Sequence, residues 1–409
     1  MSRALLPVDE ALARLLAQAA PIDAVERVST LEAAGRVLAE PVRSGIDVPP
    51  LDNTSMDGYA VRCADLSSTD RLRLAQRIPA GSVGQPLAAG TCARIFTGAP
   101  IPPGADAVVM QEQAQADGDQ VRFTHRPHPG EWVRRAGEDI RAGSVVLDAG
   151  AALSPQALGL AASVGAASLA VRRRPRVACF FTGNELAMPG EPLPPGGIYN
   201  SNRFVLRALL ARAGCQVHDL GIVPDTLDAT RDALRRAAAD ADLILTSGGV
   251  SVGDEDHVRP AVQAEGAIEL WSIAVKPGKP LAYGHVGRPA AGPAGAGRAH
   301  FIGLPGNPVS SFVTFLLFVR PFLARLAGAA DEAVRALPMR ADFDWPRPDR
   351  RREFLRVRVN AAGGLDLFPN QGSGVLTSTV WADGLLDNPP EQPIRAGDTV
   401  RFLPFAALS

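Results

Sequence analysis

The sequence predicts an α/β protein of several domains, and three observations support this prediction. The chain has 409 residues, and at about 150 residues per domain this length suggests two to four domains. Apolar strand-like runs alternate with helical patterns from about residue 176 to 328, which is typical of a parallel sheet covered by helices on both faces. Short β-type runs separated by glycine and proline precede and follow this region, indicating two further β-rich parts.

The first two parts are read from their local patterns. Residues 1–50 and 140–175 are expected to form one helical and β module, in which an amphipathic N-terminal helix packs with a helix capped by Ser154 and Pro155. Residues 51–139 read as a β-rich insertion. Its strand-like runs are Thr91 to Thr97, Ala107 to Gln111 and Val121 to Phe123.

The α/β region is expected to span residues 176–328, and a small C-terminal β domain residues 329–409. In the first of these, Ser201 is predicted to cap a helix, and a long apolar helix is expected from about Pro308 to Ala327. Predicted strands of the α/β region are Val177 to Thr182, Gln216 to Val223, Leu243 to Thr246, Leu270 to Val275 and His300 to Leu304.

Composition excludes several functional classes. The formal charge of −1 gives no overall field to attract nucleic acid or an anionic membrane. No run of 18 apolar residues occurs, and charges interrupt the apolar pattern at the N-terminus, so we expect a cytoplasmic protein. The four cysteines form no C-x-x-C pair and predict neither a zinc site nor a disulfide framework.

The identity of the basic residues is more informative than their number. Of the 42, all but Lys276 and Lys279 are arginine. Arginine presents a broad planar fork, whereas lysine presents a compact ammonium group, so the two differ where a point charge must enter a tight site. We interpret the lysines as a functional pair. The arginine runs 172–174 and 350–352 are interpreted as solvated faces.

Three glycine-bearing turns follow predicted strands, where α/β sheets bind their ligands. Glycine lets backbone N–H groups approach a ligand, and a helix N-terminus favours anions, so these turns predict a phosphorylated ligand. Neither the Walker A pattern nor G-x-G-x-x-G follows a strand here. The first turn is Phe181 to Glu185. The candidate binding residues are Ser247, Gly248, Gly249 and Ser251 in the second turn, and Pro305, Gly306 and Asn307 in the third.

Acidic residues accompany the same strand ends. They are Glu185, Asp225, Asp254 and Asp256. Carboxylates beside a phosphate would repel it unless a hard cation bridged them, so the pattern predicts Mg²⁺ held by one or two carboxylates and by phosphate oxygens. Each acid taken singly is as readily a solvated loop residue or a helix cap. In the β-rich insertion, the polar clusters Asp52 to Tyr59 and Arg134 to Asp139 are either tight turns or parts of a site.

Six motifs, in order, resemble those of the molybdopterin molybdenumtransferases, the family of MoeA and of the gephyrin E domain. The resemblance spans the chain from the first helix to the C-terminus. The motifs are Asp52 to Ala60, Thr97 to Pro100, Gly137 to Asp139, Ser247 to Asp256, Lys276 to Pro280 and Gly303 to Pro308.

The resemblance implies an L-shaped homodimer whose subunits have four domains: an elongated N-terminal module, the insertion, a molybdopterin-binding α/β domain and a barrel-like C-terminal domain. It also implies Mg²⁺-dependent cleavage of adenylyl-molybdopterin, with insertion of molybdate at the dithiolene and release of AMP and molybdenum cofactor. Transient partners would be the molybdopterin adenylyltransferase and the molybdoenzymes. Neither nucleic acid nor a membrane is expected as a partner.

The resemblance also assigns roles to residues. Glu185, Asp225 and Asp256 would line the pterin-phosphate and Mg²⁺ region, and the glycine turns and two lysines would hold phosphate. Asp57, Thr97 and Asp139 would contribute to catalysis, from the partner subunit. Arg134 or the lysines would meet the charge of molybdate.

Two positions depart from the family pattern: Asn184 stands where aspartate is usual, and Ala136 where a third basic residue is common. Asn184 can coordinate a metal through its amide oxygen but brings no negative charge. A molybdopterin adenylyltransferase and a non-catalytic molybdopterin-binding scaffold are alternative functions. The sequence does not distinguish molybdate from tungstate, which have the same shape and charge.

Overall fold

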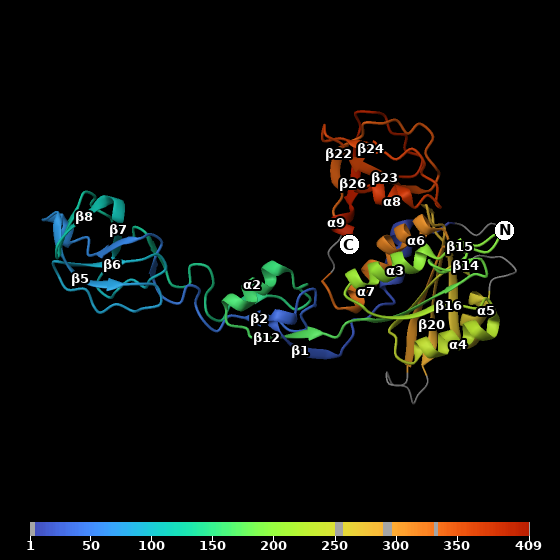
Figure 1. Cartoon of the computed structure of the whole chain (residues 1–409), viewed down its shortest axis with the longest axis horizontal. Helices are drawn as coiled ribbons and strands as arrows, with labels where there is room; N and C mark the ends of the chain where they lie inside the picture. The colour runs from blue at the N-terminus through green and yellow to red at the C-terminus, as the bar shows by residue number, and fades with distance from the viewer. Residues whose placement is uncertain (1–4, 250–256, 289–296, 331–333, 409) are drawn as a thin grey trace. The chain divides into compact units, whose positions relative to one another are not determined.

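The computed structural model describes residues 5–249, 257–288, 297–330 and 334–408 (Figure 1). Contacts within the chain divide it into two units. One contains Met1–Glu26, Gly35–Val37 and Arg172–Ser409, and the other contains Arg27–Ala34 and Leu38–Val171. The predicted α/β multidomain class is confirmed, because the structure combines a largely parallel sheet flanked by helices with separate β-rich parts.

The second unit contains a six-stranded sheet in the order β7-β4-β6-β5-β9-β8. Both faces of its central strands are covered: Tyr59 and Val109 pack in one apolar cluster, while Ala60 and Val108 pack in another. The strands are β4 (Gly58–Val61), β5 (Arg71–Ile78), β6 (Thr91–Ile95), β7 (Ala107–Met110), β8 (Ala114–Asp117) and β9 (Gln120–Phe123).

The remainder of the second unit consists of short two-stranded pairings and one helix. Helix α2 (Pro155–Ser163) begins at Ser154, whose hydroxyl accepts a hydrogen bond from the Ala157 N–H at 3.2 Å, as the sequence predicts. The strand pairs are β1 (Val25–Ser29) with β12 (Ser168–Arg172), β2 (Val42–Arg43) with β11 (Val145–Leu147), and β3 (Asn53–Thr54) with β10 (Val133–Arg134).

The first unit is built on a second six-stranded sheet, in the order β16-β13-β17-β21-β20-β18. Five of the strands run in the same direction, whereas β20 runs antiparallel to both of its neighbours, β18 and β21. These strands are β13 (Arg176–Thr182), β16 (Gln216–Val223), β17 (Leu243–Ser247), β18 (Gly266–Ser272), β20 (Pro280–Arg288) and β21 (Gly297–Leu304).

Helices cover both faces of this sheet. Alternate residues of β13 point to opposite faces, with Phe181 in one apolar core and Phe180 in the other. The helices that contribute to the Phe181 core include α1 (Val8–Leu16), α3 (Ser201–Arg212), α6 (Pro308–Thr314) and α7 (Arg320–Leu326). Two helices, α4 (Leu227–Ala238) and α5 (Val258–Glu265), contribute to the Phe180 core.

Helix α1 packs differently from what the sequence predicted. We expected it to pack with α2, but its Val8, Ala11 and Leu15 belong to the core beneath the first unit's sheet, while Ala157 of α2 belongs to a core of the second unit. Helical periodicity identifies an apolar face without identifying its partner.

The predicted long helix, Pro308–Leu326, is interrupted by a π-helical segment, Phe315–Val319. Pro321 has no N–H to donate to the carbonyl four residues before it, which disturbs the α-helical hydrogen bonding there. By length and composition this helix could cross a membrane, but 67% of it is buried within the protein. Burial in the core accounts for its apolar sequence.

The C-terminal part of the first unit is a third sheet, in the order β19-β23-β25-β26-β22, with β24 paired to β23. Strand β19 (Val275–Lys276) lies between β18 and β20 in the chain, yet pairs in parallel with β23. This pairing attaches the lysine segment to the C-terminal sheet. The other elements are β22 (Leu337–Arg340), β23 (Arg352–Val359), β24 (Leu365–Leu367), α8 (Thr377–Trp381), β25 (Gly384–Asn388), β26 (Thr399–Pro404) and α9 (Phe405–Leu408).

Candidate functional site

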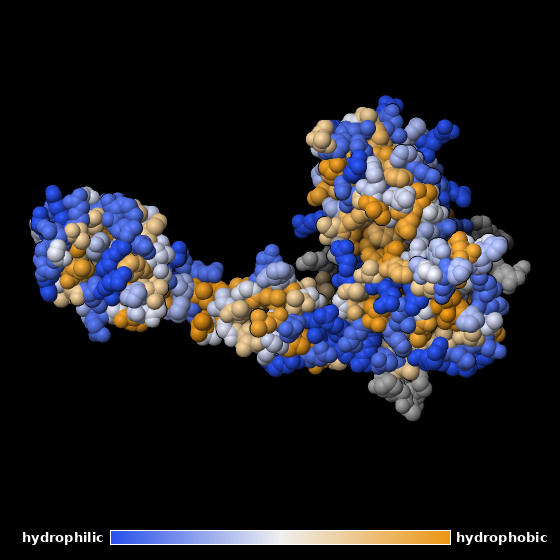
Figure 2. Space-filling view, in the orientation of Figure 1, coloured by the Kyte–Doolittle hydropathy of each residue, from blue (hydrophilic) through white to orange (hydrophobic). Residues whose placement is uncertain are grey.

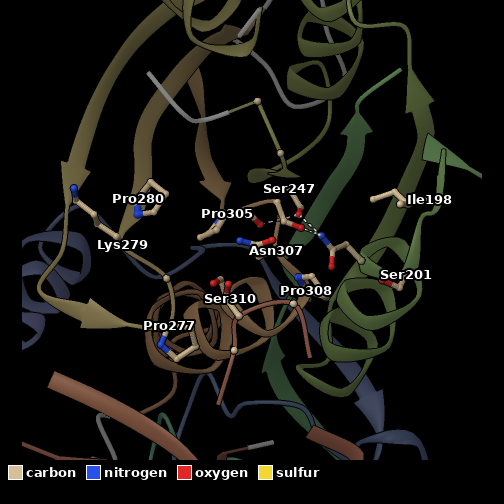
Figure 3. A pocket seen from close by; sticks show the side chains of 18 of the residues that line it. Ile198, Ser201, Ser247, Pro277, Lys279, Pro280, Pro305, Asn307, Pro308 and Ser310 are labelled. Atoms are coloured by element: carbon tan, nitrogen blue, oxygen red, sulfur yellow. Dashed lines mark hydrogen bonds between the residues drawn. The ribbon is translucent and has the colours of Figure 1, made fainter. Parts of the chain in front are cut away.

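A cavity of about 920 Å³ lies at the carboxyl ends of β13, β17 and β21 in the first unit. Figure 3 shows Ser247, Pro305, Asn307 and Ser310 near its centre, with Lys279 on one side and Ile198 on the other. The predicted residues on its wall are Glu185, Ser247, Gly248, Gly249, Lys276, Lys279, Pro305, Gly306 and Asn307, and Thr182 of the first turn also lines it. The structure therefore brings together all three glycine turns and both lysines.

The turn after β17 requires glycine. Gly249 has a φ of +63°, and a Cβ there would lie 2.5 Å from Val258 Cγ2 and 3.0 Å from Thr182 Oγ1. Any larger residue would push the turn away from its neighbours. This close packing fixes the backbone on the cavity wall.

Asn202, which the sequence analysis did not select, joins two of the turns. Its Nδ2 donates to Ser247 Oγ and to the Gly306 carbonyl, both at 2.7 Å. Ser247 Oγ in turn donates to the Pro305 carbonyl at 3.1 Å. The Ser247 side chain is thus occupied in holding the turns together. Asn202 Oδ1 is buried and has no hydrogen-bond partner among the described residues.

Asn202 reaches this position because α3 begins at the cavity. The helix is capped by Asn200, whose Oδ1 accepts a hydrogen bond from the Arg203 N–H at 3.1 Å. We expected the cap one residue later, at Ser201, but Ser201 is the first residue of the helix. The short parallel pair β14 (Leu186–Ala187) and β15 (Ile198–Tyr199) leads the chain from the first turn to this helix.

The two lysines have different environments. Lys276 Nζ lies 3.1 Å from Glu353 Oε1 and 3.5 Å from Asp349 Oδ2. Lys279 is exposed, and its ammonium group has no hydrogen bond or ion pair with any described residue. The charge of Lys276 is therefore largely compensated by the protein, while that of Lys279 is available to a ligand.

Glu353 is a fully buried carboxylate behind the cavity. Besides Lys276, it accepts a hydrogen bond from Trp345 Nε1 at 2.8 Å. Asn388 Nδ2 lies 3.5 Å away, at the limit of a weak hydrogen bond. A buried carboxylate requires such partners, so Lys276 contributes to the stability of the C-terminal sheet as well as to the cavity.

Arg351 lines the cavity and corrects our interpretation of the 350–352 run as a solvated face. Its Nε and Nη2 donate to the two carboxylate oxygens of Asp349 at 3.0 and 2.8 Å, and this hydrogen bonding holds the pKa of Asp349 well below its usual range. Arg352 donates through Nε and Nη2 to Asp387 at 2.6 and 2.8 Å. The three consecutive arginines gave no indication in the sequence that two of them pair with acidic residues.

The other arginine run is also structural. Arg173 forms two hydrogen bonds to Asp242, each of 3.0 Å, and its side chain is only 16% exposed. Arg174 donates to the Gly214 carbonyl at 3.1 Å. The interpretation of residues 172–174 as a solvated face is therefore wrong.

Residues 371–374 of the C-terminal domain form another wall of the cavity that sequence reasoning missed. The Val309 N–H donates to the Ser373 carbonyl at 3.0 Å, which ties this loop to the start of α6. The signal in the sequence was Gln371-Gly372-Ser373-Gly374, a glycine-rich turn like the other three. This turn lies outside the α/β region, where the ligand-binding turns were expected.

The predicted metal ligands are only partly assembled in the described residues. Glu185 lines the cavity, whereas Asp225 is not among its lining residues, and Ser251, Asp254 and Asp256 lie outside the described residues. No group of three metal-binding side chains occurs in the described part of the chain. Glu185 makes no side-chain hydrogen bond with a described residue. A single free carboxylate is compatible with Mg²⁺, which can be held by one carboxylate and substrate phosphates.

The remaining predicted residues belong to the second unit. Asp57 Oδ1 accepts hydrogen bonds from the Thr97 N–H at 2.8 Å and from the Thr97 hydroxyl at 2.7 Å, and these bonds, the backbone one first, lower the pKa of Asp57. Arg134 is exposed and pairs with Asn53 across β10 and β3. Asp139 is exposed, and its N–H donates to the Val48 carbonyl at 3.0 Å. Asp57 and Thr97 are thus in direct contact.

Comparison with known protein families gives three consecutive matches. Residues 6–165 match the MoeA N-terminal region (domain I and II), residues 178–325 a probable molybdopterin binding domain, and residues 338–405 the MoeA C-terminal region (domain IV). Among solved structures, a molybdopterin biosynthesis MoeA protein from Pyrococcus horikoshii OT3 is 29% identical. It matches with a TM-score of 0.83, over 98% of this chain and 100% of the other.

Relatives of known name match over most or all of their length. A molybdopterin molybdenumtransferase of Haemophilus influenzae is 37% identical, over 99% of this chain and 100% of that protein. A molybdopterin molybdenumtransferase of Nostoc is 40% identical, over 75% of this chain and 70% of that protein. A molybdopterin molybdenumtransferase 2 of Mycobacterium tuberculosis is 38% identical, over 89% of this chain and 91% of that protein. The chain belongs to the molybdopterin molybdenumtransferase family.

Proposed function

We propose that this protein is a molybdopterin molybdenumtransferase of molybdenum cofactor biosynthesis. In the proposed reaction, adenylyl-molybdopterin is cleaved in the presence of Mg²⁺, molybdate is inserted at the dithiolene, and AMP and molybdenum cofactor are released. The observation that carries this proposal is the cavity of the first unit, in which glycine turns, cations and the carboxylate of Glu185 meet. Full-length similarity to named transferases supports it.

The cavity wall suits a phosphorylated ligand. The Gly248-Gly249 and Gly306 turns permit close approach of backbone N–H groups, and the N-terminus of α3 lies at the same wall. Lys279, whose ammonium has no acidic partner among the described residues, supplies a positive charge on the cavity wall. Arg351 and Lys276 add two cations, whose charges Asp349 and Glu353 partly balance. We assign the turns and Lys279 to the phosphates of the substrate.

We propose that Glu185 holds Mg²⁺ together with substrate phosphate oxygens. A bound Mg²⁺ would neutralise the negative charge that develops on the phosphates as the adenylyl bond breaks. Asp225 and Asp256 remain predicted ligands from the family resemblance. In the absence of a cation, the free carboxylate of Glu185 would repel the phosphates, and this accounts for the proposed metal requirement.

We also propose a homodimer, to which the second unit offers an apolar surface. Residues 149–171, which include α2, contain no charged residue, and Leu31, in a turn that contacts α2, is 90% exposed. Figure 2 shows apolar side chains gathered over α2. A surface of this kind is more often an interface than a solvated face. Asp57, Thr97 and Asp139 would then serve the reaction from the partner subunit.

The test is AMP release from adenylyl-molybdopterin by the purified protein, with and without Mg²⁺ and molybdate. We expect release that requires both and that is lost in Lys279→Ala and Glu185→Ala. Arg43→Ala, which removes an exposed cation of the second unit, is the control and should leave the rate unchanged. Tight molybdopterin binding without AMP release would instead support a scaffold. AMP release independent of molybdate would contradict the transferase proposal.

A further inference from the structure

Arg356, on β23, is a buried cation without a carboxylate partner among the described residues. It is 1% exposed and is among the largest fully buried side chains in the described part of the chain. Its Nε donates to Ser378 Oγ at 3.1 Å, Nη1 to the Phe354 carbonyl at 3.2 Å, and Nη2 to the Gly372 carbonyl at 3.2 Å. Buried arginines are usually paired with acids, so this arrangement calls for an explanation beyond packing.

The cation retains its charge at neutral pH. Burial lowers the pKa of Arg356, but only to about 10. Its three acceptors are a hydroxyl and two backbone carbonyls, and it forms no ion pair within the described residues. Its positive charge is therefore not cancelled locally, and its influence extends to the polar groups around it.

Both the backbone and the side chain of Arg356 hold the loop that walls the cavity. The Arg356 N–H donates to Gln371 Oε1 at 2.9 Å, and Gln371 Nε2 donates back to the Arg356 carbonyl at 3.0 Å. The guanidinium group adds the bond to Gly372. The loop is thus anchored from the C-terminal sheet, on the side away from the cavity.

The other side of the loop presents donors without partners. The Ser373 N–H, the Ser373 hydroxyl and the Gly374 N–H donate to no described residue, although both residues line the cavity. In a trans peptide, the C=O and the following N–H point in opposite directions. Because Arg356 draws the Gly372 carbonyl inward, the Ser373 N–H of the same peptide is directed outward.

We propose that Arg356 is a positioning residue that orients the 372–373 peptide and, through its unpaired charge, strengthens the Ser373 N–H as a donor to an oxyanion in the cavity. A hydrogen bond from a cation to a carbonyl polarises the whole peptide and makes its N–H a better donor. The oxyanion is tetrahedral, either molybdate or a phosphate group of the substrate. The inference rests on the proposed function, which supplies such an anion.

The first experiment measures binding of molybdate, and separately of inorganic phosphate, to the full chain by calorimetry. Arg356→Met removes the charge and the anchor, and we expect about tenfold weaker binding of at least one anion, as for loss of a charge-assisted hydrogen bond. A fall for molybdate alone would identify molybdate as the anion held by the loop, and a fall for phosphate alone would identify a substrate phosphate. Ser378→Ala is the matched control: it removes another acceptor of the same guanidinium group and should change the affinity less than about twofold.

Arg356→Lys separates charge from packing and remains informative if Arg356→Met does not fold. A buried lysine has a lowered pKa because burial disfavours its charged form. This variant should therefore lose anion affinity relative to the wild type as pH rises through the lysine pKa. Protonation of the anion affects binding to both proteins equally, so it cancels in the ratio of variant to wild-type affinity. A residue needed only for stability would give a ratio that does not change with pH.

Turnover gives an independent readout. If the held anion is molybdate, Arg356→Lys should raise the KM for molybdate several-fold while kcat stays near the wild-type value. Unchanged affinity for both anions in a folded Arg356 variant, or an equal loss in Ser378→Ala, would overturn the inference and leave the proposed function intact. Failure of the wild-type chain to bind either anion would overturn both.

Discussion

Lys276 and Lys279 show how two residues of the same type, three positions apart, acquire different roles. Lys276 is drawn into the C-terminal sheet by the pairing of β19 with β23, where it meets Asp349 and Glu353. Lys279, beyond Pro277 and Gly278, is exposed and unpaired among the described residues. One lysine therefore supports the structure of the site, and the other is available to the ligand.

Substitution should separate these roles. Lys279→Ala should weaken substrate binding about tenfold without changing the melting temperature, because no described group depends on its ammonium. Lys276→Ala should lower the free energy of unfolding by about 2 kcal/mol, because Glu353 loses its cation. Chemical denaturation and substrate titration measure both effects. Restored stability on adding Glu353→Gln to Lys276→Ala would support this account, and equal destabilisation by the two lysine variants would contradict it.

The residues that could be predicted from the sequence are those with a local signal. The glycine turns stand directly after strands, and the lysines are conspicuous among arginines, so their presence on the cavity wall could be anticipated. Asn202 and Arg351 carry no such signal. Arg351 reaches the cavity only through the pairing of two strands more than 75 residues apart, Val275 with Arg352, and sequence patterns do not reveal such pairings.

Among the elements, β21 and β20 show what periodicity leaves undetermined. The apolar run of β21 was predicted as a strand, whereas no strand was predicted over β20. Nor would alternation of side chains have revealed the antiparallel direction of β20, because the alternation is the same in either direction. Side by side, the two strands place Tyr283 next to His300, with the Tyr283 hydroxyl 3.0 Å from His300 Nδ1. Phe322 of α7 packs edge-on against the same imidazole, with ring centroids 5.1 Å apart.

This packing makes stability depend on pH. Burial lowers the pKa of His300 to about 4, from 6.5. Below pH 6.5 the unfolded chain gains a proton that the folded chain does not, so stability should fall as pH falls towards 4. We expect a loss of about 2 kcal/mol between pH 7 and pH 5 from this residue.

Denaturation of His300→Asn at the two pH values measures that contribution. Asparagine keeps a polar group for Tyr283 but does not titrate. Between pH 7 and pH 5 the variant should therefore lose about 2 kcal/mol less stability than the wild type. His128→Asn, at a side chain that is 78% exposed, should retain the wild-type slope. An equal slope in His300→Asn and the wild type would rule out His300 as the source.

At the scale of the whole molecule, sequence patterns anticipated the order of α/β and β-rich parts along the chain. They did not reveal that α1 contributes to the core beneath the first unit's sheet, because amphipathicity does not specify a partner. The uncharged segment 149–171 and the exposed Leu31 form the surface on which the proposed homodimer depends.

If this surface forms the proposed dimer, a charge placed on it should separate the subunits. Leu31→Glu should shift the mass in sedimentation equilibrium from dimer towards monomer, because burying an unpaired carboxylate is costly. Leu31 is so exposed that the subunit itself should remain folded. Val83→Glu makes the same change at another exposed apolar residue of the second unit, 71% exposed, and should leave the mass unchanged. A dimeric Leu31→Glu variant would exclude this surface.

The scarcity of lysine has a practical consequence. Beside the amino terminus, the chain has only two primary amines, and both line the cavity. An acylating reagent would therefore act as a site-directed label without any engineering, and Lys279, free of acidic partners among the described residues, should react before Lys276. A fluorophore attached there would report on occupancy of the cavity, and protection from labelling would allow candidate ligands to be ranked in the native protein.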